Sequence, residues 1–147
     1  MKPRSIHEHY AGDHQHLDAL FHQFQSLKAG DRSHAGKSFQ EFKAGLERHI
    51  VWEEEILFPS FDRRFGHLQG GPTAVMRWEH QQIRKFLDAI ALKLDRQDFG
   101  TEEEELGLEA VLCPHNQKEE GILYPMIDQV VGEDERAEIF AAMEKTR

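Results

Sequence analysis

Apolar residues recur at intervals of three and four positions along most of the chain, the spacing that gathers them on one face of an α-helix. No stretch shows the strict alternation of a half-buried strand. The pattern predicts four long helices, over residues 5–28, about 33–58, about 73 into the nineties, and 101–126. A short amphipathic helix over about residues 134–145 is expected to pack on the outside. The fold class expected is all-α, an up-and-down four-helix bundle with a short C-terminal helix.

Capping and breaking residues set the limits of these helices. Ser5 and Thr101 each have a Glu three positions later, the sequence of a capping box, so each is expected to begin a helix. Pro59 and the Gly-Gly-Pro sequence at residues 70–72 are expected to bound an irregular connection. Pro114 lies inside the fourth helix and is expected to kink or split it.

The chain carries one sequence pattern twice. HIVWEEEILFP at residues 49–59 aligns without a gap with HNQKEEGILYP at residues 115–125, 66 positions later. The same offset places DHQHL at residues 13–17 on EHQQI at residues 79–83, so the repeated unit spans two helices. The repeat predicts an internal two-fold pseudo-symmetry in the bundle.

Polar residues of this repeat lie on the apolar stripes of all four helices. A His and a Glu four positions apart share one helix face, and here that face is the core face. The stripes are expected to continue beyond the two Glu into Ile56, Ile122 and Met126. A buried carboxylate without a partner costs several kcal/mol, so a core normally excludes it. The residues expected to converge in the interior are His14, His49, Glu53, His80, His115 and Glu119.

Bridging metal ions would satisfy these six residues together. Four imidazoles and two carboxylates suit iron, manganese or zinc. Divided equally, each of two ions receives two His and shares both Glu, and a bridging oxygen brings each ion to five ligands. A structural zinc site is closed, tetrahedral and usually rich in Cys. The pattern therefore favours two iron ions with carboxylate and oxo bridges and exchangeable positions, with zinc or manganese as substitutes.

Four motifs in order resemble those of the hemerythrin-like, or HHE cation-binding, family: DHQHLD at 13–18, HIVWEEEILFP at 49–59, EHQQI at 79–83 and HNQKEEGILYP at 115–125. The resemblance covers about residues 5–130. It implies a four-helix bundle with a non-haem di-iron site and carries the ligand role to the six residues named above.

The sequence departs in two places from the oxygen-carrying hemerythrins. Their third helix has a second His four residues after the first, where this chain has Arg84. Their last carboxylate lies five residues after its His, which here is Glu120, whereas the repeat and the helical spacing favour Glu119. The missing fifth His favours sensing, nitric-oxide or peroxide chemistry, or iron–sulfur repair, over reversible oxygen transport.

Other polar residues have simpler expected roles. Asp18 and Arg84 are repeat equivalents and are expected to form an internal salt bridge, with Asp18 an alternative ligand. Tyr10, one turn before His14, is expected in the core and is a further candidate for the vacant position. Glu54 or Glu120 could orient a ligand His. Residues expected on the surface or chemically inert are Glu55, Glu103, Glu104, Glu105, His9, His16, His22, His34, His67 and Cys113, the last as a buried or inert thiol.

Composition limits the alternatives. A chain of 147 residues is expected to form one domain over residues 1–147. The net charge of −9 argues against a nucleic-acid partner. No run of 18 apolar residues and no signal peptide is present, which predicts neither a membrane location nor export. The single Cys fits a reducing cytoplasm, and ten His direct attention to metals.

The function expected is that of a non-haem di-iron protein that binds or reacts with dioxygen, nitric oxide or peroxide, in sensing, detoxification or iron–sulfur repair. As an enzyme it would be a di-iron oxidoreductase acting on nitric oxide or peroxide. The alternative is a metal-stabilised structural bundle, or a metal store, without redox chemistry. No nucleophile triad, phosphate loop or cofactor fingerprint assigns a catalytic residue beyond the metal ligands, and the sequence leaves the oligomeric state open.

Overall fold

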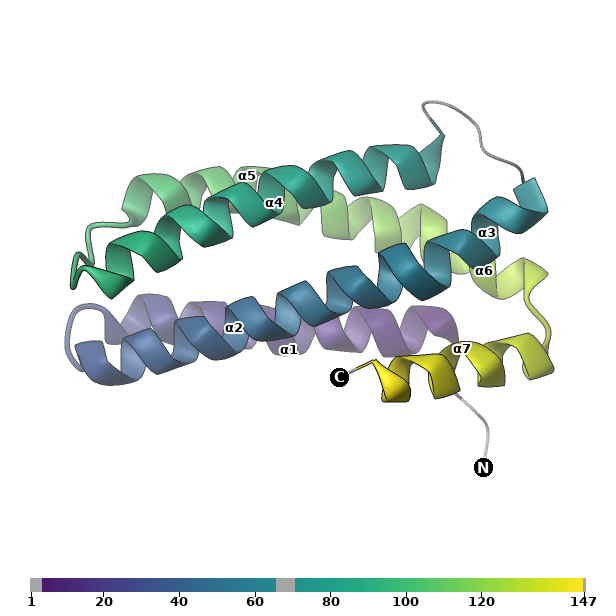
Figure 1. The fold of residues 1–147 in the computed structure, drawn as a ribbon, viewed down its shortest axis with the longest axis horizontal. Helices are drawn as coiled ribbons and strands as arrows, with labels where there is room; N and C mark the ends of the chain where they lie inside the picture. The colour runs from purple at the N-terminus through teal and green to yellow at the C-terminus, as the bar shows by residue number, and fades with distance from the viewer. Residues whose placement is uncertain (1–3, 66–70, 147) are drawn as a thin grey trace.

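Two helical hairpins lie against each other and form a four-rod bundle (Figure 1). The computed structural model describes residues 4–65 and 71–146. The elements in chain order are α1 (Ile6–Leu27), α2 (Arg32–Trp52), η1 (Glu53–Leu57), α3 (Phe58–Phe65), α4 (Pro72–Asp95), α5 (Glu102–Lys118), η2 (Glu119–Leu123), α6 (Tyr124–Val130) and α7 (Glu133–Lys145). Helix α1 pairs with α2, and α4 pairs with α5. The four rods of the bundle are α1, α2 continued through η1 into α3, α4, and α5 continued through η2 into α6. The predicted all-α bundle with a C-terminal helix is confirmed.

The C-terminal helix α7 packs on the outside of the bundle, as predicted. Its residues Ile139 and Met143 are buried. The indole N–H of Trp52, at the end of α2, donates to the carbonyl oxygens of Met143 and Thr146, both at 3.2 Å. These contacts join the end of α7 to the second rod.

The apolar core is divided into two clusters. One cluster contains Phe24, Phe42 and Leu87 and lies toward the α1–α2 turn. The other contains Ile6, Phe58 and Tyr124 and lies toward α7. The His and Glu residues of the repeat lie where the two clusters meet along each rod, so that a buried polar layer separates two apolar layers.

A wide, five-residue helical turn follows this polar layer in two of the rods. In η1 the Phe58 N–H donates to the Glu53 carbonyl, and in η2 the Tyr124 N–H donates to the Glu119 carbonyl. These π turns are themselves related by the 66-residue repeat. A π turn inserts one residue into the α-helical register and is often found at functional sites.

The extra residue changes which apolar side chains enter the core after Glu53 and Glu119. The structure buries Leu57 and Leu123, whereas Ile122 is 57% exposed and Ile56 is only partly buried. Met126 is likewise only partly buried, and Ile127 takes the core position. The predicted stripe through Ile56, Ile122 and Met126 is therefore wrong, because it assumed an unbroken α-helical period.

Neither of two predicted proline breaks ends a helix. Residues 59–65, expected to be irregular, are helical in α3, and the remaining connection at 66–70 lies outside the described residues. Pro59 and Pro125 each lie one residue beyond a π turn, whose wider backbone reduces the clash between a proline ring and the carbonyl four residues earlier. Pro114 does not split α5, and both Pro114 and Ala110, whose carbonyl loses its usual N–H partner, are exposed residues.

The two predicted capping boxes have different outcomes. The Ser5 hydroxyl accepts a hydrogen bond from the Glu8 N–H at 3.0 Å and caps α1 as expected. Thr101 is the N-cap residue of α5, but its hydroxyl donates to the Glu105 carboxylate at 2.6 Å, so no capping box forms. Glu105 is buried, where sequence predicted a solvated side chain, and Lys28 from α1 forms an ion pair with it.

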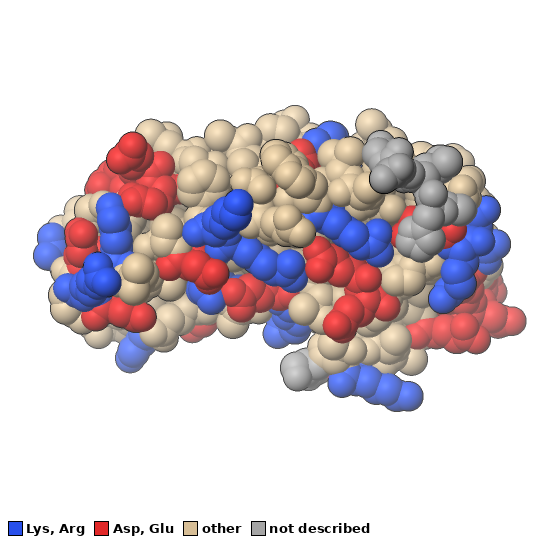
Figure 2. All heavy atoms as spheres, turned by 45° about the horizontal axis from the view of Figure 1, so that its top comes forward, with Lys and Arg blue, Asp and Glu red and all other residues tan. Residues whose placement is uncertain are grey.

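Acidic and basic side chains are intermixed over the face shown in Figure 2. Ion pairs on the bundle surface include Lys43 with Glu47 at 2.7 Å and Lys93 with Glu104 at 2.8 Å. Across the described part of the chain, no helix combines the length and the apolar character needed to cross a membrane.

Candidate metal centre

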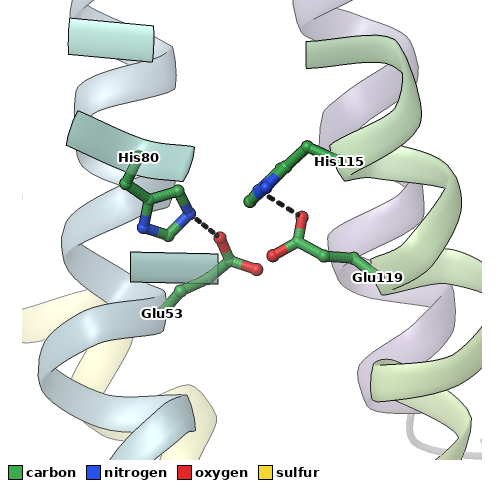
Figure 3. Close-up of side chains that lie close together, drawn as sticks. All are labelled: Glu53, His80, His115 and Glu119. Carbon is green, nitrogen blue, oxygen red and sulfur yellow. Dashed lines mark hydrogen bonds and ion pairs between the residues drawn. The ribbon is translucent and has the colours of Figure 1, made fainter. Parts of the chain in front are cut away.

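The structure brings all six residues of the predicted site together in the polar layer. Each of the four rods contributes one histidine, and Glu53 and Glu119 begin the two π turns. All six side chains are at most 3% exposed. Figure 3 shows the carboxylates of Glu53 and Glu119 facing each other between His80 and His115.

The inward-facing nitrogen of each of the four histidines lies within 3.7 Å of a carboxylate oxygen of Glu53 or Glu119. His80 Nε2 lies 3.1 Å from Glu53 Oε1, and His115 Nε2 lies 3.2 Å from Glu119 Oε1. On the other side of the site, His14 Nε2 lies 3.2 Å from the same Glu119 oxygen. His49 Nε2 lies 3.7 Å from Glu53 Oε2. One ligand atom from each of Glu53, His80, His115 and Glu119 falls within 4.8 Å of the others, and the same is true of His14, His49 and Glu119.

A second carboxylate holds the outer nitrogen of every histidine. The Nδ1 partners are Glu120 for His14 at 3.0 Å, Asp13 for His49 at 2.8 Å, Glu54 for His80 at 2.8 Å and Glu79 for His115 at 3.0 Å. A carboxylate on Nδ1 fixes the ring orientation and leaves Nε2 free to bind an ion, as is usual for metal-binding histidines.

The sequence reasoning found only half of these orienting groups. It named Glu54 and Glu120 but not Asp13 and Glu79, which precede His14 and His80 and orient histidines on the neighbouring rods. Their correspondence under the 66-residue offset was the available signal.

The buried carboxylates control the protonation of the histidines. Burial alone would lower the pKa of His49, but Glu53 and the hydrogen bond to Asp13 outweigh it and raise that pKa to about 10. Burial also opposes protonation of His80, whose hydrogen bonds to Glu53 and Glu54 raise its pKa to about 9. The pKa of His115 is raised in the same way against burial, chiefly by Glu119. The buried carboxylates thus stabilise positive charge at the site, and protons on the histidines provide that charge when no metal ion is bound.

Tyr124 is a member of the cluster that sequence reasoning missed. Its hydroxyl donates to Glu53 Oε2 at 2.7 Å and lies 3.0 Å from Glu119 Oε1. The hydroxyl oxygen of Tyr124 also lies 3.2 Å from His49 Nε2 and 3.3 Å from His14 Nε2. Burial and the two carboxylates raise the pKa of Tyr124, so the phenol keeps its proton in this arrangement. The repeated motif marks position 124 only as an aromatic residue, the repeat equivalent of Phe58.

The other candidate ligands lie outside the cluster. The Tyr10 hydroxyl points to Met143 Sδ at 3.3 Å. Asp18 is exposed. The predicted Asp18–Arg84 salt bridge is wrong. Arg84 Nη2 instead lies 3.4 Å from Oε1 of Glu54, the carboxylate that also contacts His80 Nδ1.

The other described histidines that sequence placed on the surface, and the cysteine, are exposed or half-buried. His16, His22 and His34 are exposed as predicted, and His67 lies outside the described residues. His9 is half-buried, with its ring 5.2 Å from that of Phe140. Cys113 is exposed, so the predicted buried thiol is wrong. Partial desolvation, with Asp18 and Glu109 nearby, raises its pKa, which makes the thiol less reactive.

The residues present fit a bound cation. Glu119 Oε2 is buried and has no hydrogen-bond partner within the described parts of the chain. Buried polar atoms are rarely left unpaired, and an ion shared by both carboxylates would satisfy this one. Imidazole and carboxylate are ligands that iron, manganese and zinc accept.

Comparisons with known proteins agree with this donor set. The family model described as the hemerythrin HHE cation binding domain matches residues 5–127. An uncharacterized hemerythrin-like protein of Schizosaccharomyces pombe is 26% identical over 136 residues, 92% of this chain and 65% of that protein. The iron-sulfur cluster repair protein YtfE of Edwardsiella ictaluri is 32% identical over 73 residues, 50% of this chain and 33% of that protein. The chain thus spans about two thirds and one third of the two relatives, and no solved structure matches it significantly.

Proposed function

Because the chain belongs to the family of hemerythrin HHE cation-binding domains, we propose that it is a non-haem di-iron protein that binds or reacts with dioxygen, nitric oxide or peroxide. His14 and His49 would hold one ion, and His80 and His115 the other. Glu53 and Glu119 would be shared between the two. Zinc or manganese could substitute, since the same donors accept them.

The observation that carries this proposal is the orientation of the four imidazole rings. Every Nδ1 is held by a carboxylate, and every Nε2 points toward the two fully buried glutamates. Packing alone does not explain six buried ionisable groups, because burying them costs free energy unless they have partners. Repeat symmetry in the donors implies two ions.

The burial of the site favours a small reactant. A surface pocket of about 520 Å³ is lined by residues such as Phe39, Leu94 and Phe99 and lies away from the six ligands. With ligands at most 3% exposed, a diatomic molecule or peroxide fits the site better than a larger substrate does. Two iron ions would supply the change of oxidation state, and the protein would supply their position and the exclusion of water.

One of the two relatives supports a reactive role over an inert one. One of them is named as an iron-sulfur cluster repair protein, but this chain spans only 33% of it. Repair, detoxification of nitric oxide or peroxide as a di-iron oxidoreductase, and sensing are therefore the reactive roles proposed. The second candidate is a redox-inert bundle or metal store, favoured by the position of the polar layer between two apolar clusters that a metal would join.

The two candidates are separated by loading the protein with ferrous iron without oxygen and recording its optical spectrum after adding dioxygen, nitric oxide or hydrogen peroxide. A reactive centre predicts new bands of an oxidised or liganded iron pair. His14→Ala should abolish them, whereas His16→Ala, at an exposed position on the same helix, should not. An iron-loaded protein whose spectrum responds to none of the three reagents would favour the inert bundle.

A further inference from the structure

The pseudo-symmetry of the site is broken at the repeat-equivalent residues Phe58 and Tyr124. Both follow a π turn and donate their N–H to the carbonyl of the site glutamate. The Phe58 ring centroid lies 5.8 Å from that of His80, and the Tyr124 centroid lies 5.8 Å from that of His14, the repeat equivalent. The two rings thus occupy equivalent places, and one carries an oxygen that the other lacks.

The phenol oxygen of Tyr124 lies where an ion on its side of the site would bind. Four potential ligand atoms surround it at 2.7–3.3 Å: His14 Nε2, His49 Nε2, Glu53 Oε2 and Glu119 Oε1. An ion that contacts both of these Nε2 atoms and either carboxylate must therefore be a neighbour of the phenol oxygen. Either the oxygen binds that ion or the side chain has to leave.

The packing around Tyr124 leaves no space into which its side chain could move. Its side chain is fully buried, and its ring lies 5.2 Å from that of Tyr10. The π turn before it and Pro125 after it fix the backbone from which the ring projects. Well-packed cores do not yield the volume of a phenol ring without cost.

We propose, on the basis of the di-iron function above, that Tyr124 is an additional ligand of the ion held by His14 and His49. Its phenol proton leaves for solvent when the ion binds. The ion held by His80 and His115 faces the Phe58 ring, which offers no donor atom, and retains the position that a small ligand can take. The two ions are then chemically different: one is closed by the protein and one is open.

The chain has two tyrosines, which makes the proposal testable by spectroscopy. A phenolate bound to ferric iron gives an intense charge-transfer band in the visible and characteristic phenolate vibrations in resonance Raman spectra. We expect both in the oxidised, iron-loaded protein, and we expect Tyr124→Phe to abolish them. The fold should accept this change because phenylalanine occupies the equivalent position at Phe58. Tyr10→Phe is the matched control, since the Tyr10 hydroxyl contacts Met143 Sδ, and it should leave the band unchanged.

Measuring the iron content of the same samples separates this proposal from the one on which it depends. A wild-type protein that takes up no iron contradicts the di-iron function itself. A wild-type protein with two irons but without the phenolate band, or a band that survives Tyr124→Phe, overturns the ligand role of Tyr124 and leaves the di-iron function standing. A variant that loses the band, with either two irons or one, supports it.

Azide, a small anion that binds open positions of ferric iron, tests which side is open. Phe58→Tyr places a second phenol at the equivalent position and should remove the azide-induced spectral change, whereas Tyr124→Phe should retain it. Azide binding that survives Phe58→Tyr, or that is lost in Tyr124→Phe, overturns the assignment of the open side.

Discussion

Glu119 and Glu120 are adjacent in the chain but have opposite positions in the fold. Glu119 is fully buried and faces the centre of the site. Glu120 is partly exposed, and its carboxylate reaches the outer nitrogen of His14 at 3.0 Å. Glu53 and Glu54 repeat this division of roles, with Glu54 at the outer nitrogen of His80. Neighbouring carboxylates should therefore respond differently to mutation.

Glu119→Ala should cost the protein both ions, because it removes a carboxylate that both are proposed to share. Glu53→Ala should behave alike. Glu120→Gln should keep both ions and weaken the affinity about 10–100-fold, the usual effect of disturbing a group that orients a ligand. Metal analysis after dialysis against graded chelator concentrations measures this. Glu120→Gln losing the ions while Glu119→Ala keeps them would reverse the assignment of the two residues.

Among the elements, the π turns account for most of the difference between the sequence prediction and the structure. Helical spacing predicted the rods, the stripes before Glu53 and Glu119, and the burial of the six candidate ligands. A five-residue turn leaves no periodic trace in a sequence, so the stripe was continued into Ile122 where the structure buries Leu123. The proline one residue after each turn was the only local signal, and it was interpreted as a break.

The repeat could have singled out Asp13, but which side chains pair between rods was beyond sequence reasoning. Asp13 lies on α1 but orients His49 on α2, and the Tyr124 phenol reaches histidines on α1 and α2. Such contacts depend on which rods are neighbours and on how they are rotated, and the hydrophobic pattern of one helix specifies neither.

The π-turn register makes a prediction about stability. Leu123→Ala should lower the free energy of unfolding by about 2–5 kcal/mol, because it empties a buried position. Ile122→Ala, one residue earlier and 57% exposed, should change it by no more than about 0.5 kcal/mol. Denaturant unfolding of the two variants measures both values. The stripe predicted from the sequence through Ile122 gives the opposite order, so a larger loss at Ile122 would contradict the register that η2 gives this rod.

At the scale of the whole molecule, the polar layer makes stability depend on metal. Without ions, Glu53 and Glu119 remain buried between the two apolar clusters with only protonated histidines and Tyr124 to balance them. A ligand that binds only the folded state stabilises it in proportion to the logarithm of its concentration over its dissociation constant. A metal ion bound in the polar layer would therefore join the two apolar clusters of the core.

Removal of the metal should lower the melting temperature by roughly ten degrees, from about 4 kcal/mol of linkage for an ion at ~1,000 times its dissociation constant and the usual 2–4 °C per kcal/mol in a domain of this size. Calorimetry before and after chelation measures the shift. A variant with both Glu53→Gln and Glu119→Gln is the control, and the chelator should not change its melting. An unchanged melting temperature in verified metal-free wild-type protein would contradict a buried cluster that depends on metal.

The measurement that tests the central claim most directly is the iron content per chain at saturation, after weakly bound iron has been removed. Six buried donors arranged in two repeat-related halves predict two irons per chain. A saturated protein with one iron would show that Glu53 and Glu119 are not shared between two ions, and a protein with none would contradict the metal centre altogether.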